Sequence, residues 1–183
     1  SLRCAIAIAE ELGHERPDWE LSVARLARVI ATEPDAFAPK HRWAMDWYYP
    51  VLAGVLTEDA GRAHLADRRD TFLLEDKGIR CVSDRPWVTA AETCECLIAH
   101  LAVGERELAT EMFAMAQAHR TEEDRYWTGI VYPEEATFPG GEQSTYTSAS
   151  VILAADALAG ATEASKLFVD HDAVLPPLLP LDD

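Results

Sequence analysis

The sequence predicts an all-α fold, a partial α/α toroid of about seven helices that form stacked helical hairpins with an inner and an outer layer. The first observation behind this prediction is an alternation of two kinds of helical segment. The almost wholly apolar segments cover residues 2–12, 42–56, 87–103 and 145–159. The amphipathic segments between them cover residues 17–31, 57–74 and 106–119. A helix that is apolar all round is expected inside, and one with a single apolar face is expected outside.

The second observation is a repeat of helix pairs. Trp43 and Trp87 are 44 residues apart, and Trp87 and Tyr146 are 59 apart, the excess being about the length of a long loop. Repeats with a period near ~40 residues are typical of stacked helical hairpins. A straight solenoid of helix pairs is the alternative architecture, because it repeats in the same way.

The ends of these segments carry ordinary helix signals. Gly13, Gly104 and Gly160 each follow an apolar or amphipathic run, as glycine does at helix C-termini. Asp18 is expected in the first turn of the second helix, where the helix dipole favours an acid. The T-E-D-A run at 57–60 predicts the start of the fourth helix. Pro50 is expected to kink the third helix or to mark its start.

Segments without helical periodicity are predicted to be the connections between the helices. Residues 77–85 form a loop that runs briefly extended at 79–82, and a long loop rich in aromatics and acids precedes the helix at 145. Such long loops in compact domains are usually functional or disordered, and the aromatic content argues against disorder. A short helix is expected at 162–169. We therefore expect one domain over 1–169, part of a larger toroid, and an extended tail over 170–183, where prolines oppose helix.

The composition excludes several classes of partner. The chain has 183 residues and a net charge of −16, which repels nucleic acid and anionic membrane. No apolar run is long enough for a membrane span. The four cysteines do not resemble a disulfide framework in a chain of this size, so buried free thiols and a cytoplasmic location are expected.

Several motifs resemble a known set of proteins. They are M-D-W-Y-Y-P-V-L, C-V-S-D-R-P-W, W-V-T-A-A-E-T-C-E, Y-W-T-G-I-V-Y-P and V-I-L-A-A-D-A-L. In these motifs, from Leu2 to about Phe168, the chain resembles actinobacterial proteins labelled prenyltransferases, and through them the α/α toroid of terpenoid cyclases and six-hairpin glycosidases. The resemblance implies that the chain corresponds to their carboxyl half, so a missing N-terminal half or a homo-oligomer is expected to cover its open edge.

In a toroid, the pocket opens where the N-terminal ends of the inner helices meet. Paired carboxylates there carry out acid–base chemistry on glycosidic bonds, and aromatic faces stack on sugars or prenyl chains. The candidate catalytic residues are Asp46, Glu92, Glu142 and Asp84. The candidate substrate-binding residues are Trp43, Trp47, Tyr48, Arg85, Trp87, Tyr126, Trp127, Tyr132 and Tyr146.

Structural roles remain open for the same acids. Asp46 and Glu92 stand within apolar segments, where a carboxylate is costly unless it is paired or solvated. Asp46 could accept from Arg42, Glu92 could pair with Arg85, and Asp84 could cap the helix that follows it. Glu142 could be a solvated loop residue. Asp156, deep in its helix, is expected to be a structural partner.

Three functions are therefore carried forward. The first is a carbohydrate-active protein, hydrolytic or glycan-binding. The second is an isoprenoid-binding or prenyltransferase-like protein, although neither a D-D-x-x-D nor a D-x-D-D motif occurs. The third is a non-catalytic helical-repeat interaction domain. No cofactor and no metal are expected, since Asp170, His171 and Asp172 are adjacent and rarely converge on one ion in such an arrangement.

Overall fold

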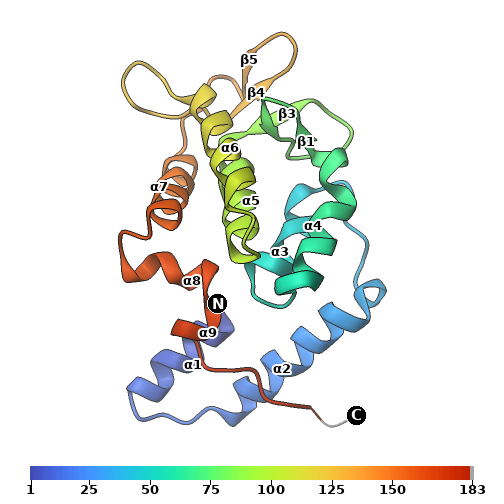
Figure 1. Ribbon diagram of the computed structural model, residues 1–183, viewed down its shortest axis with the longest axis vertical. Helices are drawn as coiled ribbons and strands as arrows, with labels where there is room; N and C mark the ends of the chain where they lie inside the picture. The colour runs from blue at the N-terminus through green and yellow to red at the C-terminus, as the bar shows by residue number, and fades with distance from the viewer. Residues whose placement is uncertain (182–183) are drawn as a thin grey trace.

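The computed structural model describes residues 1–181, and the predicted helices are confirmed within a few residues (Figure 1). The helices are α1 (Leu2–Glu11), α2 (Pro17–Thr32), α3 (Ala44–Leu52), α4 (Glu58–Phe72), α5 (Ala90–Ala102), α6 (Arg106–Ala116), α7 (Thr145–Ala159), α8 (Lys166–Val169) and α9 (His171–Val174). Short 3-10 turns cover Pro34–Ala36, Gln117–His119 and Glu163–Ser165.

The all-α prediction, and the partial α/α toroid with it, is wrong, because the connections form two small antiparallel sheets. One sheet pairs β1 (Leu73–Leu74) with β2 (Gly78–Ile79). The other has the order β3 (Trp87–Thr89), β4 (Gly129–Val131), β5 (Ala136–Phe138). Both lie at one end of the helices, at the top of Figure 1. The fold is therefore mixed, with helices dominant.

The three-stranded sheet joins distant parts of the chain in front of α5. Trp87 pairs with Val131, and Thr89 pairs with Gly129, so the long loop returns to the start of α5. Gly129 faces the ring of Phe138 on β5 so closely that a Cβ at this position would collide with the ring. The segment predicted as the beginning of a helix at Trp87 is instead a strand, since Val88 and Thr89 are β-branched and gain partners from residues about 40 positions away.

Helix α5 is the centre of the main core. Cys94, Leu97 and Ile98 are among the buried residues of α5, and buried residues occur in every turn of this helix. It packs against α3, α6 and α7, while α4 lies against α3. Helix α7 is fixed at both ends: the Ser144 hydroxyl accepts from the Thr147 amide, and Gly160 ends it in the left-handed conformation.

The expectation that every apolar helix is buried on all sides is wrong for α1 and α7. Ile8 and Leu12 on α1 are 61% and 68% exposed, and Ile152 on α7 is 68% exposed. Helices α1 and α2 form a hairpin at the lower end of Figure 1, where α9 lies beside α1. In residues 1–181 no helix combines the length and apolarity needed to cross a membrane. The four cysteines are free thiols, as predicted, and Cys94 and Cys96 are buried.

The predicted extended tail begins instead with a helical turn, α9, and returns to the N-terminus. The Arg3 guanidinium donates to the Pro176 carbonyl at 3.0 Å and pairs with Asp172 at 3.2 Å. His171 Nε2 donates to the Leu52 carbonyl at 3.1 Å. Residues 175–181 have no regular secondary structure, and the last two tail residues, 182–183, lie outside the described residues. The tail therefore connects α1 to the end of α3.

We expect Gly54→Ala to loosen this connection. Gly54 has φ +69°, and a Cβ there would lie 2.7 Å from the His171 ring. The substitution should cost about 1 kcal/mol for the left-handed backbone and displace His171 in addition. Gly160→Ala is the matched control, because Gly160 has φ +60° and open space around it. Hydrogen exchange should show faster exchange in residues 170–175 for Gly54→Ala alone; equal exchange in both variants would contradict the prediction.

Candidate functional site

Two glutamates on α5 form the centre of the candidate site. Glu92 and Glu95 are three residues apart in this helix, so both side chains lie on one face, with Cβ atoms roughly 5–6 Å apart. Both are partly buried, whereas the residues around them on α5 are almost all buried and apolar. Helices α3 and α7 pack on either side of α5 and contribute the remaining groups.

Glu92 is held in a form suited to carrying a proton. Burial raises the pKa of its carboxyl, the Thr89 hydroxyl and a backbone amide act in the opposite direction, and the charge of Glu95 raises it further. The Thr89 hydroxyl donates to one carboxyl oxygen, Oε2. Because Thr89 lies at the junction of β3 and α5, the three-stranded sheet sets the position of this carboxyl.

Glu95 is held between two tyrosines from different helices. The Tyr48 hydroxyl of α3 donates to Oε2 at 2.7 Å, and the Tyr146 hydroxyl of α7 donates to Oε1. Burial, together with the charge of Glu95, raises the pKa of both phenols above its usual range. They therefore remain protonated donors at neutral pH. Both carboxylate oxygens act as acceptors, so the ionised form of Glu95 satisfies both phenols.

Two exposed aromatic side chains, Tyr49 and Tyr146, lie near Glu95, and a third, Trp43, lies just before α3. Tyr146 is 56% exposed, and Tyr49 on α3 is 41% exposed although burial and Glu95 raise the pKa of its phenol. Trp43, just before α3, is 45% exposed, and the Arg42 guanidinium lies 5.0 Å from its ring centroid. Rings that are exposed on one face while fixed at the other can stack on the apolar face of a sugar.

The long loop brings a third carboxylate to the start of α5. The Thr128 hydroxyl donates to Glu142 Oε2 at 2.8 Å, and the Thr128 amide donates to the Glu142 carbonyl. The Ala90 amide at the start of α5 donates to the Thr128 carbonyl at 3.3 Å. Glu142 itself is exposed. This arrangement links Glu142 through Thr128 to the N-terminus of α5.

The other predicted acids have different positions. Asp46 is exposed, so the expectation that it is a costly acid in a buried helix is wrong. Asp84 pairs with Arg42 at 3.0 Å. Desolvation acts to raise the pKa of the Asp84 carboxyl, but the bond to Arg42 and its charge outweigh this effect and lower the pKa. Asp84 therefore does not serve as the predicted helix cap. Asp156 is a structural partner, as predicted, because it accepts from the amide and the hydroxyl of Thr162.

Several predicted substrate-binding side chains belong to the core. Trp47 and Tyr48 are buried, and Tyr48 reaches the site only through its hydroxyl. Tyr132 is buried in a small second core, with the Lys77 ammonium 4.9 Å from its ring centroid. The Tyr126 hydroxyl donates to Gln117 at 2.8 Å, and its ring packs against the main core. Trp47, Tyr48 and Tyr132 therefore present no open aromatic face, whereas Tyr126 is partly exposed.

The remaining predicted substrate-binding residues are at least partly exposed. Trp87 is partly exposed, with its ring centroid 5.5 Å from that of Phe138. Trp127 is partly exposed and lies near Gly141, and Arg85 is exposed in the turn before β3. Sequence reasoning missed Glu95 and Tyr49. The spacing of the two glutamates in A-E-T-C-E could have indicated Glu95, because residues three apart share a helix face.

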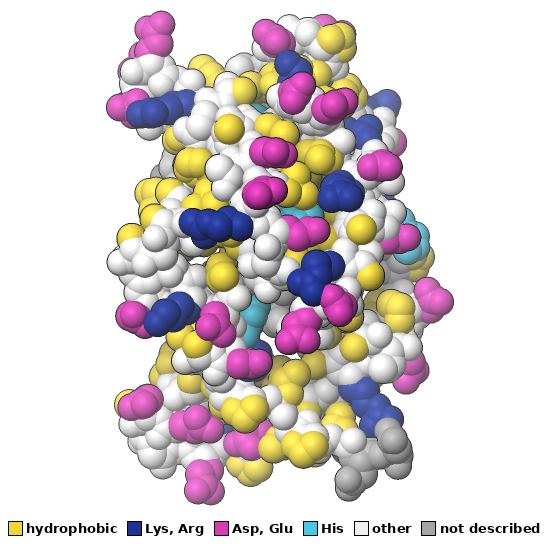
Figure 2. Space-filling view, in the orientation of Figure 1, with side chains coloured by type: hydrophobic (Ala, Val, Ile, Leu, Met, Phe, Trp, Pro, Cys, Tyr) yellow, Lys and Arg dark blue, Asp and Glu magenta, His cyan; other side chains and the backbone are white. Residues whose placement is uncertain are grey.

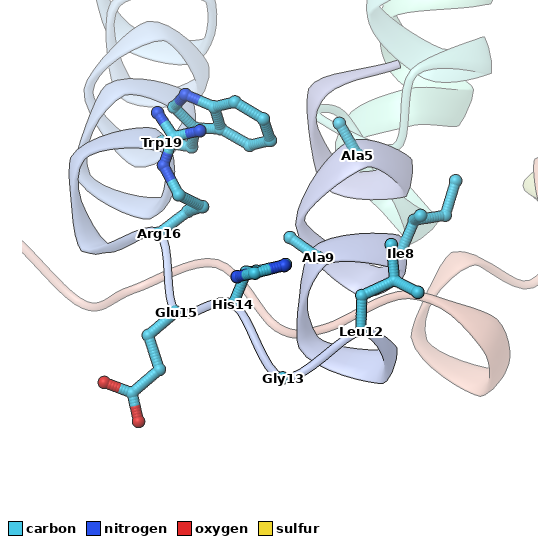
Figure 3. Close-up of a pocket in the computed structure, with 9 residues that line it drawn as sticks. All are labelled: Ala5, Ile8, Ala9, Leu12, Gly13, His14, Glu15, Arg16 and Trp19. Atoms are coloured by element: carbon cyan, nitrogen blue, oxygen red, sulfur yellow. The ribbon is translucent and has the colours of Figure 1, made fainter.

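A cavity lies away from these carboxyl groups. It has a volume of about 650 Å³ and lies at the α1–α2 turn, between Ile8 and Leu12 on one side and Trp19 on the other (Figure 3). The Arg16 guanidinium lies 3.5 Å from the Trp19 ring centroid, and Glu15 points away from the cavity. The cavity is open and apolar, and it holds no pair of carboxylates. The chemistry therefore points to the α5 glutamates rather than to this cavity.

Two further features of the described residues concern metal binding and surface charge. Among residues 1–181, no group of three histidine, cysteine or acidic side chains is placed to hold a metal ion. Acidic side chains are spread over the face shown in Figure 2 from one end to the other, in agreement with the net charge of −16. The candidate site therefore combines the partly buried carboxyl group of Glu92 with the carboxyl groups of Glu95 and Glu142 and with exposed aromatic rings.

Comparison with known proteins finds a relative that is named as a glycoside-cleaving enzyme. The particular relative is the MMP endo-(1,4)-3-O-methyl-alpha-D-mannosidase of Mycolicibacterium hassiacum, to which the chain is 48% identical over 168 residues. The match covers 92% of this chain and 46% of the relative, so the chain spans about half the length of the enzyme it resembles. No protein-family model matches the chain. The resemblance to prenyltransferase-labelled proteins is untested by these comparisons and stays a prediction.

Proposed function

We propose that the chain belongs to a glycoside hydrolase that cleaves an internal α-mannosidic linkage in a glycan. The observation that carries this proposal is Glu92, a partly buried carboxyl group whose pKa burial raises and which lies one helical turn from Glu95 and the exposed tyrosines near it. A proton donor for a glycosidic oxygen needs such an environment, because it must still hold its proton near neutral pH. The 48% identity to a mannosidase supports the same reaction class.

In this proposal Glu92 protonates the leaving oxygen. Its free oxygen carries the proton, while Thr89 holds the other oxygen in place. Glu142 is the candidate for the second carboxylate, which acts as base or nucleophile, because it is exposed and tied to the start of α5 through Thr128. Glu95 is unsuited to that role, since both its oxygens accept from tyrosines.

The substrate class follows from the exposed rings. Tyr49, Tyr146 and Trp43 offer aromatic faces rather than cations, which suits a neutral sugar better than a phosphorylated one. A methylated sugar presents additional apolar surface to such rings. We therefore propose a neutral, O-methylated mannose oligosaccharide as the substrate.

The test is to incubate the protein with a 1,4-linked oligosaccharide of 3-O-methyl-α-mannose and to follow its products by mass spectrometry. Shorter internal fragments are the expected result. The unmethylated α-1,4-mannose oligosaccharide and a β-linked mannose oligosaccharide serve as controls. If neither cleavage nor binding of the α-linked oligosaccharides is seen, the proposed function is wrong.

A further inference from the structure

The two hydrogen bonds at Glu95 call for an explanation beyond packing. A carboxylate that is partly withdrawn from water, as Glu95 is, is costly, and an uncharged side chain would avoid this cost. Instead Glu95 takes one phenol from α3 and one from α7, the two helices that pack on opposite sides of α5. Three helices thus fix one negative charge a single turn from Glu92.

We propose that Glu95 is a positioning residue for Glu92: the charge held between Tyr48 and Tyr146 keeps the proton on the neighbouring carboxyl group. This inference rests on the proposed function, in which Glu92 is the acid. Like charges close together in a poorly solvated site cannot easily both be present. Hydrogen bonds from two phenols favour a charge at Glu95, and this charge adds to burial in raising the pKa of Glu92.

The groups that face Glu95 agree with this assignment. From α3 they are Tyr48 and Tyr49, and from α7 Tyr146. From α5 they are Glu92, Cys94 and Cys96. None of these groups is cationic. Burial raises the pKa of the Cys94 thiol to about 12, so this thiol stays neutral at working pH. Glu95 is then the charge that Glu92 experiences within this cluster.

The arrangement also couples the acid to substrate binding. The Tyr146 ring is 56% exposed, although its hydroxyl is committed to Glu95. A sugar stacked on this ring would hold the phenol against Glu95, and the position of Glu95 in turn affects the proton on Glu92. Tyr48 is fully buried, so its hydrogen bond to Glu95 does not depend on a bound sugar.

The experiment is a titration of the protein labelled with ¹³C at glutamate carboxyl carbons, in which the Glu92 signal is identified by its loss in Glu92→Gln. We expect Glu95→Gln to lower the Glu92 midpoint by about one pH unit, the size of effect expected for a partly solvated neighbouring charge. Tyr48→Phe and Tyr146→Phe should lower it less, and Glu95→Asp should restore part of the shift. Glu105→Gln is the matched control, since Glu105 pairs with buried His100 at 2.5 Å beyond the other end of α5.

An unchanged or raised Glu92 midpoint in Glu95→Gln would overturn the inference, whatever the protein hydrolyses. If the midpoint falls but no oligosaccharide is cleaved, the proposed function fails while the coupling stands. Where cleavage is observed, the alkaline limb of the kcat profile should move to lower pH in Glu95→Gln with little change in KM. A loss of activity with no such movement would indicate a merely structural role and would also overturn the inference.

Discussion

Glu92→Gln is expected to lower kcat for oligosaccharide cleavage by about 10²- to 10⁴-fold, the usual contribution of a general acid. Glutamine keeps the shape of the side chain and can still accept from Thr89, so folding and substrate binding should be retained. The measurement is kcat and KM for the 1,4-linked 3-O-methyl-α-mannose oligosaccharide. Glu107→Gln, an exposed glutamate in the first turn of α6, is the control and should leave both constants unchanged.

The pH dependence of the activity is a second test of the role of Glu92 as the acid. Because the pKa of Glu92 is raised, the carboxyl group holds its proton to a higher pH than an exposed glutamate would. Activity should therefore persist below this pKa and fall as the pH rises through it. A substrate with a good leaving group, such as a nitrophenyl mannoside, needs less protonation and should lose less rate in Glu92→Gln. Equal losses for both substrates would contradict a role as acid.

Helix existence and helix order could be predicted from the sequence because both depend on local periodicity. The alternation of apolar and amphipathic segments indicates where each helix lies along the chain, and glycines such as Gly160 mark helix ends. The sheets could not be predicted in the same way. The pairing of Val88 with Ile130 depends on a contact across 42 residues, which a local pattern does not contain.

The candidate site was predictable only in part, for a related reason. Glu92 could be recognised because an acid in an apolar helix needs an explanation. Glu95 has its partners on α3 and α7, so its role depends on how three helices pack. Asp46 shares an apolar segment with Trp47, yet it points to solvent, because composition alone does not reveal which side of a helix is covered.

Trp47→Ala is expected to destabilise the protein strongly, by about 3–5 kcal/mol, as large-to-small core changes do. The Trp47 ring is 1% exposed and stacks on Phe72 with centroids 5.4 Å apart. Its Nε1 donates to the His64 carbonyl at 3.2 Å, and His64 Nε2 donates in return to the Trp47 carbonyl at 2.7 Å. The substitution removes the ring stacking and the Nε1 hydrogen bond, whereas the bond from His64 to the backbone carbonyl of residue 47 can remain. Urea unfolding followed by circular dichroism measures the change.

Trp43→Ala is the matched variant, because the two tryptophans are four residues apart and the sequence assigned both to substrate binding. Trp43 is 45% exposed with Arg42 over its ring, so its removal should cost less than about 1 kcal/mol of stability. Its effect should appear instead as a higher KM, if the exposed ring stacks on sugar. A large stability loss in Trp43→Ala, or a small one in Trp47→Ala, would contradict this division between core and site. Comparing the two variants distinguishes an aromatic side chain that stabilises the fold from one that can contact a glycan. The sequence alone does not make this distinction, because both residues are tryptophans in neighbouring positions.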